Sequence, residues 1–457
     1  MRWRTTSAFI MALLMASRAA SQSSAGADER LAVRPPMGWN SWDGYGTTIN
    51  EEQFKANAKW MAENLKTSGW EYAVMDMEWF VTNPTPAGNS KSSVYALDVN
   101  GRYMPAENRF PSAAGGKGFK PLGDYVHSLG LKFGIHILRG IPKKAVEGNS
   151  PIAGSTYHAG DAADTSETCP WNPDNFGADA GKAAAQAYYD SIASLYASWG
   201  VDLIKVDCIS SHPYRGDEIR MLSEAIRKTV RPILLSLSPG AAPLEKIDEM
   251  REYAQMWRIS DDIWDIWHSD IPYPQGLGDQ FENVLKWAGK SQPGHWPDAD
   301  MLPLGYLGPA PGWGKPRPTR LSHNEQETLM TLWAIFPSPL MVGGDLTAAD
   351  LWTKSLLTNA EVIAMNQHST GSRAAIVTDK LVVWVADSTD DKGMYIAVFN
   401  RGSELADVHY SWKEFGLTGR QYALRSLWQH ADAGKADALT AKLPPHSCLL
   451  YRATKVN

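Results

Sequence analysis

The feature that most constrains the fold is a repeated alternation of short β-rich runs with amphipathic helical stretches between Met37 and about Gln367. Short apolar runs predict strands, and apolar residues at three- and four-residue spacing predict helices that pack on a sheet. Strands that alternate with helices form parallel sheets. We count eight such units over this region, which suits a closed (β/α)8 barrel better than an open, doubly wound sheet.

The predicted strands are short and mostly apolar, as strands buried on both faces are. They are Met37–Trp42, Tyr72–Trp79, Lys132–Leu138, Val201–Asp207, Ile233–Ser238, Met256–Ser260, Trp296–Leu302 and Ser338–Gly343. The predicted helices include Glu51–Lys66, Lys182–Trp199, Asp217–Lys228 and Asn324–Ile335. We therefore predict an α/β fold with a (β/α)8 barrel over residues 34–368.

The pattern changes after about Ser369, where strands follow one another without intervening helices. The predicted strands of this part are Leu381–Ala386, Met394–Asn400, Tyr422–Trp428 and Cys448–Arg452. Consecutive strands joined by turns are typical of antiparallel sheets. We predict a separate C-terminal antiparallel β-sandwich domain over residues 369–457.

The N-terminus has the layout of a secretory signal peptide. Arg2 and Arg4 precede an apolar run from Ala8 to Ala16, and small residues follow through Ala27. The apolar run is too short to span a bilayer. We predict a signal peptide over residues 1–27 and a soluble exported protein, either secreted or periplasmic.

Composition narrows the class of partner. The formal net charge is −6 in 457 residues, and no run of Lys and Arg indicates a nucleic acid or an anionic membrane as partner. This charge distribution favours a neutral substrate over a polyanionic one. The 19 Trp residues include more than a core requires, and Trp rings stack well on the apolar faces of sugars. Three Cys residues permit one disulfide at most.

Acidic residues stand at the C-terminal ends of several predicted barrel strands. They are Asp76, Asp207, Asp261, Asp262, Asp298 and Asp300. Two long connections, Phe80 to Gly118 and Arg139 to about Pro173, also follow strands. In a (β/α)8 barrel both features meet at the face where active sites are assembled. Two carboxyl groups that face each other across such a mouth are what hydrolysis of a glycosidic bond requires.

Each of these acidic positions also has a structural interpretation. Lys205 and Asp207 share the inward face of a strand, where an ammonium would keep a nucleophilic carboxylate ionised, but the pair would also fit as an inert ion pair between barrel layers. Asp261 and Asp262 would fit as a helix N-cap and first-turn carboxylate. The His residues lack metal-ligand spacing, so we expect no metal site.

Several motifs together resemble glycoside hydrolase family 27, which contains α-galactosidases and α-N-acetylgalactosaminidases. The motifs are Arg-Pro-Pro-Met-Gly-Trp-Asn-Ser-Trp (Arg34–Trp42), Asn108–Pro111, Tyr125–Ile135, Gly-Val-Asp-Leu-Ile-Lys-Val-Asp (Gly200–Asp207), Trp257–Asp265, His295–Leu302 and Leu332–Gln367. They occur in the family's order and span essentially the whole chain after the leader. As a set they are highly specific.

The resemblance implies a catalytic (β/α)8 barrel followed by a β-sandwich, no cofactor, and retaining hydrolysis through a covalent glycosyl-enzyme intermediate. The family's Lys-x-Asp nucleophile falls on Asp207, with Lys205 contacting the sugar. The Trp-Arg-x-x-x-Asp acid/base falls on Asp262, with Arg258 as a sugar ligand.

Further positions follow from the same resemblance. Trp42 matches the family's stacking Trp, and Asp76 matches the first of two adjacent Asp residues that hold sugar hydroxyls. The family also joins a Cys in the loop after the third strand to one just after the nucleophile, which implies a disulfide between Cys169 and Cys208.

Four substrate-binding positions depart from the family pattern. Met77 replaces the second hydroxyl-binding carboxylate, and period two points Glu78 the same way as Asp76, so Glu78 would replace the missing acceptor in part. His136 stands where the family has an aromatic residue. Ser238 stands where α-galactosidases tend to have a Glu that crowds the C2 substituent. These changes predict altered sugar selectivity with unchanged chemistry.

The sequence therefore predicts an exo-acting enzyme that releases terminal α-linked galactose from oligosaccharides, polysaccharides or glycoconjugates. The alternatives are another sugar, namely an α-N-acetylgalactosaminide, a β-L-arabinopyranoside or an α-glucan end; a transglycosylase; and a barrel that binds carbohydrate without catalysis. The presence of both Asp207 and Asp262 argues against the last. No sequence feature specifies an oligomeric state.

Overall fold

The computed structural model describes residues 31–85, 88, 92–308, 315–389 and 393–456. The predicted signal peptide, residues 1–27, lies outside the described residues. Within these ranges, no helix is both long and apolar enough to cross a membrane.

Eight parallel strands form the barrel. They are β1 (Met37–Asn40), β2 (Tyr72–Met75), β3 (Lys132–Leu138), β7 (Leu203–Asp207), β8 (Leu234–Leu237), β9 (Met256–Arg258), β10 (Trp296–Asp298) and β13 (Leu340–Val342). The strands are hydrogen-bonded in the order β10-β9-β8-β7-β3-β2-β1-β13. A parallel bridge between Leu302 and Val342 joins the two ends of this order and closes the ring. The (β/α)8 architecture and the places of the eight strands are confirmed, but several strands are shorter than predicted; β2, for example, ends at Met75 and not at Trp79.

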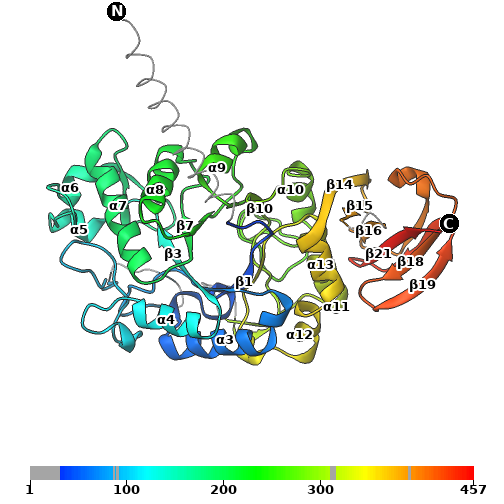
Figure 1. Cartoon of the computed structure of the whole chain (residues 1–457), viewed down its shortest axis with the longest axis horizontal. Coiled ribbons are helices and arrows are strands. Elements are labelled where there is room, and N and C mark those ends of the chain that lie inside the picture. The colour runs from blue at the N-terminus through cyan, green and yellow to red at the C-terminus, as the bar shows by residue number, and fades with distance from the viewer. Residues whose placement is uncertain (1–30, 86–87, 89–91, 309–314, 390–392, 457) are drawn as a thin grey trace, which may run out of the picture.

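Helices cover the outside of the barrel, as Figure 1 shows. They are α3 (Glu51–Asn64), α4 (Lys120–Ser128), α7 (Ala183–Ser198), α8 (Gly216–Lys228), α9 (Ile247–Tyr253), α10 (Gln280–Lys286), α11 (His323–Ile335), α12 (Leu351–Leu357) and α13 (Ala360–His368). Local signals set their ends: Asn50 and Ser322 each form a capping box at the start of α3 and α11. Their apolar faces join the barrel strands in one large core.

The barrel interior is packed rather than open. A separate apolar cluster inside it includes Tyr72, Val74, Leu203, Leu234 and Met256, with Trp42 and Met77 near the mouth. Gly38 in β1 allows the closest approach in this layer, because a Cβ there would lie 2.3 Å from the carbonyl oxygen of Tyr72. The cluster forms a floor beneath the C-terminal ends of the strands, where polar side chains begin.

The C-terminal part is an antiparallel β-sandwich, as predicted. One sheet has the order β14-β15-β16-β21-β18-β19, and the other pairs β17 with β20. The strands are β14 (Ser369–Val377), β15 (Leu381–Ser388), β16 (Met394–Asn400), β17 (Ala406–Ser411), β18 (Tyr422–Ser426), β19 (Ala431–Ala436), β20 (Ala438–Leu443) and β21 (Cys448–Lys455). Trp384 and Phe399 belong to the same apolar core as the barrel helices. The sandwich therefore packs on the side of the barrel that carries α11 and α13 (Figure 1).

The long connection after β3 carries its own small sheet of β4 (Ile141–Pro142), β6 (Asn175–Ala178) and β5 (Ala163–Thr168). A disulfide joins Cys169 at the end of this connection to Cys208, which directly follows β7. The two Cα atoms lie 6.0 Å apart, the usual separation for a disulfide. The pairing implied by the family resemblance is confirmed, and it fixes the connection to the barrel mouth.

We predict that the denatured, unreduced protein contains one titratable thiol, Cys448. Cys208→Ser should lower the Tm by several degrees, because a cross-link that closes a loop of this length restricts the unfolded chain by about 4 kcal/mol. Circular dichroism with and without dithiothreitol measures the effect. Cys448→Ser is the control and should keep the sensitivity of the parent to reductant. Three titratable thiols would contradict the pairing.

Candidate active site

A cavity of about 620 Å³ opens at the C-terminal ends of the barrel strands. Its size is typical of a pocket for a small ligand. The strand ends and the loops after them line it with Trp42, Thr47, Asp76, Met77, Glu78, Gly88, Pro170, Trp171, Asn172, Pro173, Lys205, Asp207, His212, Ser238, Pro239, Asp261, Asp262, Pro272, Tyr273 and Met301. Carboxylates, aromatic rings and one ammonium thus share a single hollow.

Asp207 is the last residue of β7, and its side chain is largely buried. Nε1 of Trp171 donates to Oδ1 of Asp207 at 3.2 Å, and Nε2 of His136 lies 3.0 Å from Oδ2. His136 comes from β3, the strand paired with β7. These contacts fix the plane of the Asp207 carboxyl group, which lines the cavity.

Lys205 lies on the inward face of β7 together with Asp207, as the period of two predicts, and both line the cavity. The ion pair of Lys205 is with Asp76, however, at 2.8 Å, and not with Asp207. Asn40 also donates to Oδ2 of Asp76, at 2.8 Å. Burial raises the pKa of Asp76, but the Lys205 ammonium outweighs it and holds that pKa well below its usual value. Asp76 is therefore ionised, and Lys205 is its counter-ion.

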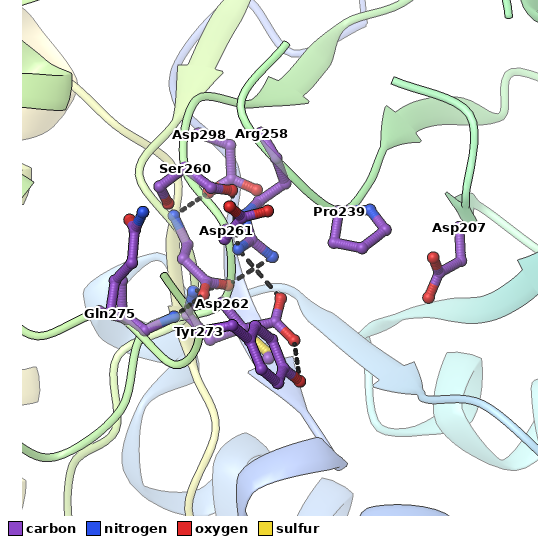
Figure 2. Close-up of polar contacts among 12 residues, drawn as sticks. Asp207, Pro239, Arg258, Ser260, Asp261, Asp262, Tyr273, Gln275 and Asp298 are labelled. Atoms are coloured by element: carbon purple, nitrogen blue, oxygen red, sulfur yellow. Dashed lines mark hydrogen bonds and ion pairs between the residues drawn. The ribbon is translucent and has the colours of Figure 1, made fainter. Parts of the chain in front are cut away.

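Figure 2 shows Asp262 near the middle of the view and Asp207 at its right. Nη2 of Arg258 contacts Oδ1 of Asp262 at 3.1 Å, and the Tyr273 hydroxyl donates to Oδ2 at 3.2 Å. Arg258 is the last residue of β9 and is 2% exposed, so its guanidinium contacts Asp262 from the buried side of the cavity wall. Both oxygens of Asp262 are thus oriented by neighbouring side chains.

Asp300 shares Arg258 with Asp262. Nη1 of Arg258 lies 2.8 Å from Oδ1 of Asp300, and the backbone N–H of Ile263 donates to Oδ2 at 2.7 Å. Burial raises the pKa of Asp300 to about 7; Arg258 opposes this rise and the Asp262 carboxylate adds to it. Asp300, whose pKa is raised by burial, thus contacts the same guanidinium as Asp262.

The remaining predicted positions surround the same cavity. Trp42, at the start of the short helix α2 (Trp42–Tyr45), is 8% exposed and forms part of its wall. Met77 and Ser238 also line it, and Ser238 Oγ has no hydrogen-bond partner among the described residues. Glu78 lines the cavity too, but not for the reason predicted. β2 ends at Met75 and Glu78 has a φ of +64°, so strand alternation does not reach it.

His136 and Arg258 do not line the cavity. Each is 2% exposed and lies behind a carboxylate, His136 behind Asp207 and Arg258 behind Asp262. Asp261 lines the cavity at its rim and pairs with His212, whose Nε2 lies 3.3 Å from Oδ1 of Asp261. Asp261 and Asp262, which the sequence left as alternatives, thus have different environments: Asp261 lies at the rim, and Asp262 is held by a buried guanidinium.

The residues of the cavity wall that sequence analysis missed include Trp171, His212 and Tyr273. The proximity of Trp171 to Cys169 was the one available signal, because a disulfide to the residue after β7 brings that segment to the mouth. Within the described ranges, no group of three or more His, Cys, Asp or Glu side chains is arranged to hold a metal ion.

Two carboxyl groups share the cavity, and their hydrogen-bond partners differ. Asp207 is fixed by an indole and an imidazole, and Asp262 by a guanidinium and a phenol. Such a pair can divide nucleophilic and acid/base roles between its members. The ionised Asp76 and Lys205 add fixed polar groups that would orient hydroxyls of a bound sugar.

Comparison with known proteins shows the family of the chain. Residues 175–368 match the family model described as alpha galactosidase A, and residues 378–453 match the alpha galactosidase C-terminal beta sandwich domain. The curated alpha-galactosidase of Cyamopsis tetragonoloba is 30% identical over 435 residues, covering 94% of this chain and 88% of that protein.

Two solved structures are more similar in sequence. The family 27 β-L-arabinopyranosidase of Geobacillus stearothermophilus is 46% identical with a TM-score of 0.90, covering 94% of this chain and 98% of that one. A putative alpha-N-acetylgalactosaminidase of Bacillus halodurans is 40% identical with a TM-score of 0.81, covering 92% and 97%. The chain therefore belongs to glycoside hydrolase family 27, the α-galactosidase family, and is a glycoside hydrolase.

Proposed function

We propose that this enzyme is a retaining exo-glycosidase for sugars with the ring stereochemistry of galactose, and that among them it prefers the pentose β-L-arabinopyranose to α-D-galactose. The two sugars have the same configuration at every ring hydroxyl, and the pentose lacks C6. The observation that carries the preference is the apolar Met77 side chain in the cavity wall beside the ionised Asp76.

Asp207 is the nucleophile of this proposal, and Asp262 is the acid/base. Asp207 attacks C1 while the bond from C1 to the leaving oxygen breaks and Asp262 protonates that oxygen. Water then attacks C1 and gives its proton to Asp262, and Asp207 leaves with its electron pair. The different hydrogen-bond partners of the two carboxyl groups support this division. We expect them about 5–5.5 Å apart, the spacing of retaining enzymes.

The sugar-binding roles follow from the cavity wall. Asp76 and Lys205 would hold adjacent hydroxyls, and Trp42 would pack against the face of the ring. Arg258 and His136 lie behind the catalytic carboxylates, so their contribution to sugar binding would be made together with Asp262 and Asp207. Ser238 leaves space on the side where a larger residue would exclude a C2 substituent, and Glu78 adds a carboxylate next to Met77.

The chemistry of recognition and one comparison support the pentose. A site that hydrogen-bonds a hydroxyl rejects ligands without it strongly, whereas an apolar wall discriminates weakly. Met77 removes such a hydrogen bond. The solved relative at 46% identity is itself a β-L-arabinopyranosidase, while the curated α-galactosidase from Cyamopsis is 30% identical.

We also propose that the enzyme is exported, either secreted or periplasmic. The support is the sequence of residues 1–27, in which two Arg residues precede an apolar run and small residues.

We predict that Asp207→Asn abolishes turnover, because an amide cannot form the glycosyl-enzyme ester. The parent should release a product with the anomeric configuration of its substrate, as observed by NMR during the first turnovers. Binding of free sugar to Asp207→Asn, measured by calorimetry, should survive and serves as the folding control. An inverted product would contradict the assignment of Asp207 as nucleophile.

Asp262→Ala should slow the formation of the glycosyl-enzyme only when the leaving group needs an acid. Hydrolysis of a methyl glycoside, a poor leaving group, should fall at least about 100-fold, since general acid catalysis contributes about 100- to 10,000-fold. A dinitrophenyl glycoside, which leaves without protonation, should still form the glycosyl-enzyme, and azide should restore its turnover as a glycosyl azide. Asp261→Ala is the matched control. If Asp261→Ala shows this pattern and Asp262→Ala does not, the acid/base is Asp261 and not Asp262.

Met77→Asp should raise kcat/KM for a nitrophenyl α-D-galactoside relative to the β-L-arabinopyranoside by about 10- to 100-fold. The reason is that a hydrogen bond to a charged group contributes about 1.5–3 kcal/mol. Met77→Leu keeps an apolar wall and should leave the ratio near that of the parent. A parent enzyme that already prefers the galactoside, together with an unchanged ratio in Met77→Asp, would reject Met77 as the selectivity determinant.

A further inference from the structure

Asp300 is a buried carboxylate just after β10, and it has no role in the proposed reaction as described above. It is 2% exposed and does not line the large cavity. It lines instead a small cavity of about 30 Å³ inside the barrel, together with Lys205, Arg258 and Asp298. A sugar in the large cavity would therefore not contact Asp300, and any effect of this side chain on the reaction must act through another residue.

Both oxygens of Asp300 contact groups that hold Asp262. Oδ1 of Asp300 lies 2.8 Å from Nη1 of Arg258. Nη2 of the same guanidinium lies 3.1 Å from Oδ1 of Asp262, a contact drawn in Figure 2. Oδ2 of Asp300 accepts from the backbone N–H of Ile263 at 2.7 Å, and Ile263 directly follows Asp262 in the chain. Asp300 thus holds the Asp262 side chain through Arg258 and the Asp262 backbone through Ile263.

The backbone of Asp300 is fixed in a conformation that residues other than glycine rarely adopt. Its φ is +90°. Nε1 of Trp333 in α11 donates to the carbonyl oxygen of Asp300 at 2.8 Å, and the N–H of Asp300 donates to Oδ1 of Asp298 at 3.0 Å. Such conformations persist only where surrounding contacts enforce them, and they cluster at functional sites. Contacts from α11 and β10 therefore fix the backbone from which Asp300 reaches Arg258 and Ile263.

Asp262 and Asp300 share one cation, so their charges are coupled. The ionised member of such a pair is a like charge for the other, so the pair holds its last proton more tightly than a single carboxylate would. Burial raises the pKa of Asp300; Arg258 opposes this rise and Asp262 adds to it. The other charged or titratable groups that face the pair come from α2, β7, the segment after β9, and β10: Asp43, Lys205, Tyr273 and Asp298.

We infer that Asp300 is a positioning residue that keeps a proton available to Asp262 for the departure of the leaving group. This inference rests on the proposed function, in which Asp262 is the general acid. Arg258 by itself favours the ionised form of Asp262, which has no proton to donate. The negative charge of Asp300 on the same guanidinium offsets that effect, and the bond to Ile263 keeps Asp262 in place.

Asp300 itself exchanges no proton with the substrate. The proton moves from Asp262 to the leaving oxygen while the bond from that oxygen to C1 breaks. In the second step, water attacks C1 and returns a proton to Asp262. Asp300 acts on both steps only through Arg258 and Ile263, which it contacts directly.

The test is the pH dependence of kcat/KM for methyl β-L-arabinopyranoside, whose leaving group needs an acid. Activity of the parent should fall as the pH rises through the upper titration of the pair. Asp300→Asn removes the charge and keeps an acceptor for Ile263, and Asn tolerates a positive φ. Without the like charge the last proton is lost at a lower pH, so the basic limb should move down by about one pH unit. The acidic limb, which we assign to Asp207, should not move.

A second substrate separates this role from a purely structural one. A dinitrophenyl β-L-arabinopyranoside leaves without protonation, so its kcat/KM should show no basic limb from the pair in the parent or in Asp300→Asn. The two proteins should therefore differ on the methyl glycoside at high pH and agree on the dinitrophenyl glycoside. Activity on the dinitrophenyl glycoside also shows that each variant is folded.

Two further variants complete the experiment. Asp265 is a buried carboxylate on the same segment as Asp262, but its ion pair is with Arg317, at 2.7 Å. Asp265→Asn should keep the basic limb of the parent. Asp300→Gly also suits a positive φ, and it removes both the charge and the acceptor for Ile263. It should show the same shift and a further loss of about five-fold on the methyl glycoside at low pH, as expected for one lost hydrogen bond.

Three results would overturn the role of Asp300. They are an unmoved basic limb in Asp300→Asn, an equal shift in Asp265→Asn, and an equal loss on the methyl and dinitrophenyl glycosides. If Asp300→Asn does not fold, the same three results are sought with Asp300→Gly. Failure of the proposed function looks different, because Asp262→Ala would then hydrolyse the methyl glycoside as fast as the parent does.

Discussion

Two buried cations, Lys205 and Arg258, allow several carboxylates to share one cavity at the mouth of the barrel. Lys205 pairs with Asp76, and Arg258 lies between Asp262 and Asp300. Carboxylates gathered in a poorly solvated space would otherwise take up protons, because burial and mutual repulsion both disfavour the charged form. The pKa of Asp43 shows this tendency, since burial and the neighbouring Asp300 raise it well above its usual value.

The two cations also contact different carboxylates of the cavity. Lys205 keeps Asp76 ionised on the side where a sugar ring would be held, and it takes no part in fixing Asp207. Arg258 contacts Oδ1 of Asp262, and the Tyr273 hydroxyl donates to Oδ2. Asp207 depends on neither cation and is fixed instead by Trp171 and His136. The proposed reacting groups and the proposed binding groups are thus held by separate interactions, which would let sugar selectivity vary without a change in the chemistry.

In the proposed function, sugar selectivity depends on residues that take no part in ion pairs. Met77 and Ser238 line the same cavity as the charged groups, yet neither takes part in an ion pair. A substitution at either position therefore changes the shape and polarity of the wall and leaves the ion pairs beneath it intact. At the cavity mouth, the Cys169–Cys208 disulfide holds the loop that carries Trp171, and the Trp171 indole in turn donates to Asp207.

The sequence by itself determined the strands, the barrel and the positions of the charged residues. Periodicity is a local property, so β3 was predicted with its observed ends and Asp207 was correctly placed at the end of β7. Only the tertiary structure decided the partners: Lys205 contacts Asp76 across 129 positions, and Trp171 and Tyr273 reach carboxylates 36 and 11 positions away. Those contacts depend on which strands are neighbours and on the path of irregular loops, and no local pattern encodes either.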